Sequence, residues 1–79
     1  MTILQTIEKG GQERKVVRII YKDSKGAFTE RRIEPYEIKN GKVWGYCLNN
    51  NGIRQFNISG IIEAVLTQES FEPRWVIKL

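Results

Sequence analysis

The chain contains no histidine and a single cysteine, Cys47. Without histidine, a serine or cysteine nucleophile lacks its usual general base, and the commonest zinc ligand is missing. One cysteine cannot form a disulfide within the chain or build a structural zinc or iron–sulfur site, and it favours a reducing, cytoplasmic setting. We therefore expect a protein that is not an enzyme and uses no metal or cofactor.

Long apolar runs are also absent, so we expect neither a membrane span nor a secretory signal. The 79 residues are 41% hydrophobic and 28% charged, which is the composition of a globular domain and not of a disordered chain. We expect one domain over residues 1–79. A domain of this size buries a small core and has a thin stability margin.

The formal net charge is +4 and is unevenly distributed. Residues 1–42 carry ten Lys and Arg against six Asp and Glu, whereas residues 43–79 carry three of each. A basic excess of this kind favours polyanionic partners such as nucleic acid. It also serves the solubility of an ordinary charged surface, and charge alone leaves both interpretations open.

Short β-type segments separated by turn residues fill most of the chain. Residues 2–9 instead predict a short helix, with Thr2 and Gln5 at capping-box spacing and Gly10-Gly11 as its end. Asn40-Gly41 is a strong hairpin signal, and Pro35 marks a strand end, bend or edge. The predicted strands are residues 15–22, 27–33, 36–39, 42–48, 53–58, 61–66 and 74–79. Short turns between strands predict a mainly β fold, a small antiparallel β-barrel with a short N-terminal helix.

Several side chains on these strands are candidates for either a core or a binding surface. Trp44 and Tyr46 lie two residues apart and share a face, which suits base stacking or core packing equally. Arg54 alternates with Phe56 in the same way, so one of the two is expected at a rim. Two further residues are expected inside, Trp75 as a core residue and Cys47 as a small apolar filler.

The order of these features resembles the WYL domain. The motifs that carry the resemblance run through the whole chain in sequence order: a short helix before Ile19-Ile20-Tyr21, then Arg31-x-Ile33-x-Pro35, a strand with Trp44 and Tyr46, Arg54-x-Phe56, Ile61, and Ser70-Phe71-Glu72-Pro73-Arg74. The resemblance implies an Sm-like or SH3-like barrel that acts as a ligand-sensing module in transcription regulation, in bacteria or their phages. Such domains usually follow a helix-turn-helix domain, for which this chain has no room, so we expect a stand-alone module.

Relatives of this kind bind nucleic acid, often single-stranded DNA, or nucleotides, and the resemblance implies that Arg31, Tyr46 and Arg54 face the ligand. The sequence departs from the family at two places. The region of the naming triplet reads Val43-Trp44-Gly45-Tyr46-Cys47-Leu48, which leaves the strand register open. Gly60 stands where many members carry a second arginine. The anion site is therefore weaker, altered, or rebuilt from Arg32 or Arg18.

The sequence thus predicts a binding module for an anionic ligand, with single-stranded nucleic acid or a nucleotide as the partner. Arginine forks suit phosphate, and flat aromatic rings suit bases. The candidates are Arg31 and Arg54, with Arg18 and Arg32 in reserve, and the aromatic residues Tyr46 and Trp44. The alternative is a protein–protein interaction or assembly module, in which the aromatic face is buried in a homodimer or against a regulated partner.

Overall fold

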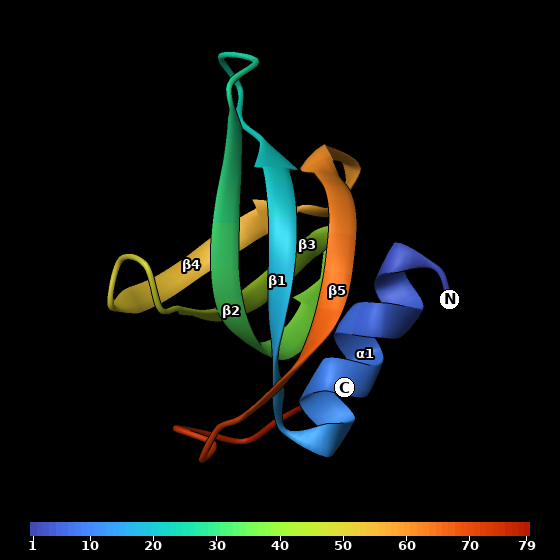
Figure 1. Ribbon diagram of the computed structural model, residues 1–79, viewed down its shortest axis with the longest axis vertical. Coiled ribbons are helices and arrows are strands. Elements are labelled where there is room, and N and C mark those ends of the chain that lie inside the picture. Colours follow the sequence, from blue (N-terminus) through green and yellow to red (C-terminus); the bar gives the residue numbers. More distant parts are fainter.

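The computed structural model describes residues 1–79 as one helix and a five-stranded antiparallel sheet (Figure 1). The spatial order of the strands is β4-β3-β2-β1-β5. The elements are α1 (Ile3–Glu13), β1 (Lys15–Lys22), β2 (Phe28–Lys39), β3 (Lys42–Cys47), β4 (Gly52–Asn57), the 3-10 turn η1 (Ile58–Gly60) and β5 (Ile61–Ser70). No helix is long and apolar enough to cross a membrane.

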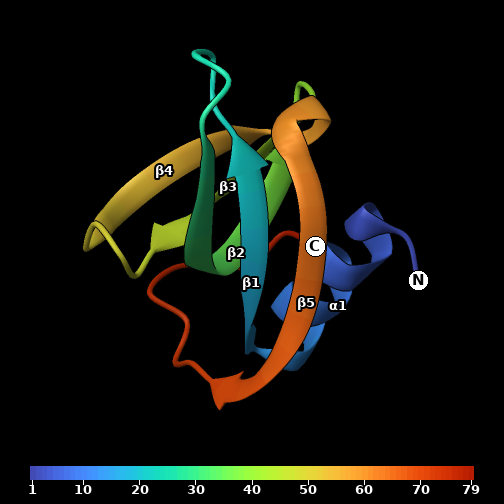
Figure 2. The same ribbon diagram turned by 45° about the horizontal axis from the view of Figure 1, so that its top comes forward.

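The longest strand, β2, bends the sheet. Its first half pairs with β1 as far as Ile33, and its second half pairs with β3. A bulge between Pro35 and Glu37 lies in the second half of β2, where the strand changes direction. As a result, β3 and β4 cross behind β1 and β2 (Figures 1 and 2). The prediction of two strands divided near Pro35 was therefore wrong, and the bend, the other interpretation of Pro35, is the correct one. Pro35 is tolerated inside β2 because the pairing with β1 has already ended, and no neighbour on that side requires its missing N–H.

The core fills the inner, concave face of the bent sheet. Eight buried residues form it: Ile7 from α1 together with Val17, Ile19, Ile33, Val43, Cys47, Phe56 and Ile61. Phe56 of β4 packs edge-to-face on Tyr21 of β1, with ring centroids 5.0 Å apart, and this contact holds β4 across the inside of the sheet. Strands β4 and β5 are not paired with each other. The mainly β fold with a short N-terminal helix is thus confirmed, and the closed Sm-like or SH3-like barrel is not.

The helix is longer than predicted. Its start is as expected, because the Thr2 hydroxyl accepts from the Gln5 amide and the Gln5 side chain accepts from the Thr2 amide. It then continues through Gly10 and Gly11, so the predicted end at these glycines was wrong. A Cβ at Gly10 would collide with Val17, and one at Gly11 would collide with Leu79, so the glycines allow close packing here. The left-handed residue that ends the helix is Arg14, with φ 57°.

The hairpin and strand predictions before residue 66 are largely confirmed. Asn40 and Gly41 have φ values of 53° and 72°, which fit a tight hairpin between β2 and β3. Strand β5 extends beyond its predicted end to Ser70.

The predicted closing strand over residues 74–79 was wrong. Residues 71–79, the C-terminal tail, join no strand and turn back from the end of β5 (Figures 1 and 2). The amide of Lys78 donates to the Tyr36 carbonyl at 2.7 Å, and Leu79 meets Gly11 of α1. Trp75 stacks on Tyr36 with ring centroids 4.1 Å apart but is 39% exposed, so it is not the core residue that was expected.

Candidate ligand-binding site

The strand register assigns each predicted site residue to one face of the sheet. Directly paired residues share a face, and faces alternate along each strand. Arg31 is paired with the core residue Ile19, and Arg54 lies two residues from buried Phe56, so both arginines belong to the inner face. The remaining four candidates belong to the outer face: Arg18 and Arg32, which are paired with each other, Tyr46, which is paired with Glu34, and Trp44, which is paired with Glu37.

The two inner-face arginines have no carboxylate partner within 4.0 Å. Arg31 is half-buried, and its side chain donates to two neutral oxygens, Oδ1 of Asn50 and, at 3.4 Å, Oγ1 of Thr29. Arg54 is exposed, and its guanidinium makes no hydrogen bond within the protein. The positive charges of Arg31 and Arg54 are therefore not compensated by the chain itself.

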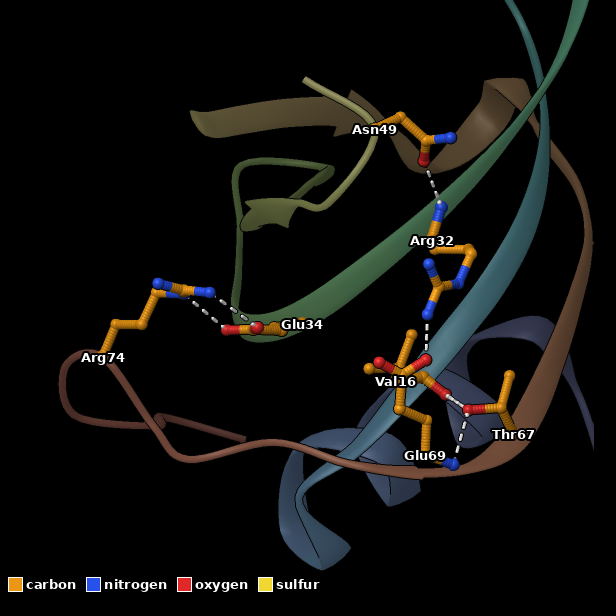
Figure 3. Close-up of polar contacts among 7 residues, drawn as sticks. All are labelled: Val16, Arg32, Glu34, Asn49, Thr67, Glu69 and Arg74. Carbon is orange, nitrogen blue, oxygen red and sulfur yellow. Dashed lines mark hydrogen bonds and ion pairs between the residues drawn. The ribbon is translucent and has the colours of Figure 1, made fainter. Parts of the chain in front are cut away.

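The two outer-face arginines are neutralised by ion pairs. Arg18 lies 3.2 Å from the carboxylate of Glu30 and 4.0 Å from that of Glu63. Arg32 forms an ion pair with Glu69, and its backbone amide donates to Asn49 Oδ1 at 2.8 Å (Figure 3). Glu69 is held in place by Thr67, whose hydroxyl accepts from the Glu69 amide and donates to the Val16 carbonyl (Figure 3). An anion could therefore bind Arg18 or Arg32 only in competition with these carboxylates.

Tyr46 already has a stacking partner. The guanidinium of Arg74, from the C-terminal tail, lies 3.7 Å from the centre of the Tyr46 ring. The same guanidinium donates to both carboxylate oxygens of Glu34, at 3.0 and 3.3 Å (Figure 3). A base that stacked on this face of Tyr46 would have to displace Arg74.

Trp44 is half-buried on the same outer face. The sequence left open whether Trp44 packs in the core or lies on a surface, and in the structure it takes no part in the core.

Comparison with known protein families identifies the family of this chain. Residues 2–66 match the family model of the WYL domain. The chain belongs to the WYL domain family. The family consists of regulatory, ligand-sensing domains that are not catalytic. No curated protein matches the chain.

The polar network around Glu34 is the part of this WYL domain that sequence reasoning missed. Tyr36 donates its hydroxyl hydrogen to Glu34 at 2.8 Å and accepts from the Arg74 amide at 2.9 Å. Burial raises the pKa of Tyr36 to about 12, and the bond to Glu34 acts in the same direction. Hydrogen bonds to Glu34 raise the pKa of Arg74 above its ordinary value. Glu34 and Arg74 lie forty residues apart, and no local pattern marks them as partners.

The WYL domain also has one cleft, which the sequence did not indicate. It has a volume of about 480 Å³ and opens between the turn after β1 and the connection from β4 to β5. Gly60 is one of its lining residues. A Cβ at residue 60 would lie 2.8 Å from Tyr21 Cε1 and 2.9 Å from the Lys22 carbonyl oxygen, so a side chain here would require Tyr21 or the backbone at Lys22 to shift. No cluster of three or more potential metal ligands is present.

Proposed function

We propose that this WYL domain is a non-enzymatic binding module for a phosphate-bearing ligand, single-stranded nucleic acid or a nucleotide. The observation that carries the proposal is the difference between the arginines that form ion pairs with carboxylates and those that do not. Arg31 and Arg54 share the inner face and have no carboxylate partner, whereas both outer-face arginines are ion-paired. An uncompensated guanidinium can exchange its water for a phosphate oxygen without first breaking an ion pair.

The overall charge supports the same ligand class. The chain carries 13 Lys and Arg against 9 Asp and Glu, and a net charge of +4 attracts polyanions over distances of about a Debye length. Binding of this kind would serve as the input of a regulatory domain, and a cytoplasmic role in transcription regulation fits the family. Tyr46 and Trp44 lie on the opposite face from Arg31 and Arg54, so phosphate binding at the arginines does not depend on them.

Fluorescence anisotropy with labelled oligothymidine, at two salt concentrations, tests the proposal. Arg54→Gln and Arg31→Gln each remove one uncompensated charge, and Arg18→Gln is the matched control because it removes the same charge from the outer face. We expect the first two variants to weaken binding and to lower the slope of log K against log salt by about 1. Equal effects of all three variants would show that only net charge matters, and absence of binding by the unmodified protein would refute the proposal.

A second candidate function, self-assembly, is favoured by the exposed edge of the sheet. Strand β4 is an edge, and its Ile53 is 61% exposed beside Tyr46 on the outer face. An unpaired edge with an exposed apolar side chain is a natural surface for a second copy or a regulated partner protein. Sedimentation velocity over a range of concentrations, with Ile53→Lys as the variant, tests this function. A monomer at every concentration would argue against homodimer formation.

A further inference from the structure

The outer face of β2 and β3 carries a group of side chains that fits one arginine. Glu34 and Tyr46 are directly paired, so the carboxylate and the ring lie next to each other. Arg74 donates to both oxygens of Glu34, at 3.0 and 3.3 Å, while its guanidinium lies 3.7 Å from the centre of the Tyr46 ring (Figure 3). A planar guanidinium makes both contacts at once, and an ammonium cannot form the same fork. This group therefore selects arginine over lysine.

Tyr36 adds a place for an aromatic residue directly after the arginine. Its hydroxyl accepts from the Arg74 amide at 2.9 Å and donates to Glu34 at 2.8 Å. The next residue, Trp75, stacks on the Tyr36 ring with centroids 4.1 Å apart and an angle of 24° between the ring planes. Glu34, Tyr36 and Tyr46, the Glu34 site, thus recognise two consecutive residues. Arginine and tryptophan are also the side chains that most often dominate the energy of protein interfaces.

The sheet supplies every group of the Glu34 site. Glu34 and Tyr36 belong to β2 and Tyr46 belongs to β3, so the site does not need the tail for its construction. The Glu34 side chain is 4% exposed, and Arg74 is the one cation within 4.0 Å of its carboxylate. A carboxylate in such a position is costly to leave without a cation. If the tail moves away, the site therefore favours the binding of another guanidinium.

The tail that fills the Glu34 site is held at few points. It joins no strand, and two backbone hydrogen bonds connect it to the rest of the chain, from Phe71 to the Arg14 carbonyl and from Lys78 to the Tyr36 carbonyl. Val76 is 71% exposed, and the match to the family model ends at residue 66, before the tail begins. A segment with few buried apolar contacts opens at a small cost in free energy. Another segment with the same two side chains can therefore replace it.

We propose that the Glu34 site is a docking site for a partner protein that presents an arginine followed by an aromatic residue, and that the tail is its intramolecular competitor. The partner would place its guanidinium on the Glu34 carboxylate, as Arg74 does. A tethered competitor lowers the apparent affinity to the extent that it keeps the site closed. This interaction lies on the outer face and does not involve Arg31 or Arg54 of the inner face.

The first test measures fluorescence anisotropy of a labelled peptide with the sequence of residues 71–79. Arg74→Ala combined with Trp75→Ala, in the full chain, removes the two side chains with which the tail competes. We expect this double variant to bind the peptide at least about tenfold more tightly than the unmodified protein does. The same peptide carrying Arg74→Lys should bind roughly tenfold more weakly. Equal binding of the two peptides, or no binding by the folded double variant, would overturn the proposal.

Glu34→Gln, added to the double variant, tests the site itself. Glu37→Gln is the matched control, because it removes the same charge from the same strand at a residue that forms no ion pair with Arg74. We expect Glu34→Gln to weaken peptide binding by about tenfold and the control to weaken it by less than about twofold. Equal losses in both variants would mean that the peptide responds only to net charge, and the docking site would be rejected.

A second measurement needs no variant and decides the matter even if the double variant does not fold. In the unmodified protein, a millimolar concentration of the peptide should displace the tail, so the indole N–H signal of Trp75 should move in NMR spectra. A signal that stays fixed as peptide is added would overturn the proposal. Sedimentation velocity identifies the occupant. Dimers of the unmodified protein that are lost in the double variant would assign the site to the tail of a second copy and overturn the assignment to a partner protein.

Discussion

The guanidinium of Arg74 donates two hydrogen bonds to the carboxylate of Glu34, which lies forty residues earlier in the chain. The two partners differ in their environment, because the Glu34 side chain is 4% exposed and that of Arg74 is 45% exposed. Together with the bonds from the Arg74 and Lys78 amides to Tyr36, this contact ties the C-terminal tail to the bend of β2. It also places a cation over Tyr46, on the outer face of the sheet.

The difference in exposure predicts an asymmetric response to mutation. Arg74→Ala leaves a buried carboxylate without a cation, whereas Glu34→Gln leaves an arginine that water already reaches. We expect Arg74→Ala to lower the melting temperature by roughly 5–10 °C and Glu34→Gln to lower it by less. Arg18→Gln, at an exposed ion pair, is the control and should change stability by about 0–1 kcal/mol. A larger effect of Glu34→Gln than of Arg74→Ala would contradict this explanation.

The raised pKa of Tyr36 predicts a loss of stability at high pH. The folded state holds the phenolic proton up to a pKa of about 12, whereas the unfolded chain releases it near the ordinary value of 10.0. The stabilisation is therefore complete below about pH 10 and is lost as the pH rises toward about 12, by roughly 1–3 kcal/mol. Denaturant unfolding of the protein and of Tyr36→Phe across this range measures the difference. Parallel pH dependence of the two proteins would show that Tyr36 titrates normally.

Gly45 is predicted to be intolerant of any side chain. A Cβ at this position of β3 would lie 2.6 Å from the Glu34 carbonyl oxygen, a backbone atom that cannot rotate away. We expect Gly45→Ala to destabilise the protein by about 2–3 kcal/mol in denaturant unfolding. Gly26→Ala is the comparison. Gly26 has φ 81°, and a Cβ added there would meet nothing within 4 Å beyond its chain neighbours, so the substitution should cost about 1 kcal/mol from backbone strain alone. Equal costs would mean that β2 and β3 separate easily.

The thiol of Cys47 should report on unfolding. Cys47 is 0% exposed in the core, where its Sγ lies 3.2 Å from Asn50 Oδ1. We expect Ellman's reagent to react slowly with the native protein and completely in denaturant. Ser24→Cys in the exposed turn, combined with Cys47→Ala, should react at once in the native state. Rapid native labelling of Cys47 would show that the edge formed by β3 and β4 opens readily.

Local sequence patterns were sufficient to predict most strands of the sheet. The alternation of β-branched residues over 15–22 defines β1, and Asn40-Gly41 defines the β2–β3 hairpin, because both depend on backbone preferences of adjacent residues. The same alternation assigns Arg31 and Arg32 to opposite faces, and the pairing of β2 with β1 confirms this. Capping by Thr2 and Gln5 is equally local, and it was also correct.

Contacts between distant segments decided the rest. Gly10 and Gly11 remain helical because Val17 and Leu79 pack against them, which no helix-end signal reveals. The tail becomes a covering segment and not a strand because Glu34 and Tyr36, at the bend of β2, bind it. Only the folded chain places Glu30 beside Arg18 and Glu69 beside Arg32 while it leaves Arg31 and Arg54 uncompensated. The sequence by itself determined most of the strands and the alternation of faces along them. The tertiary structure decided which charges remain free, because ion pairs form between residues that only folding brings together.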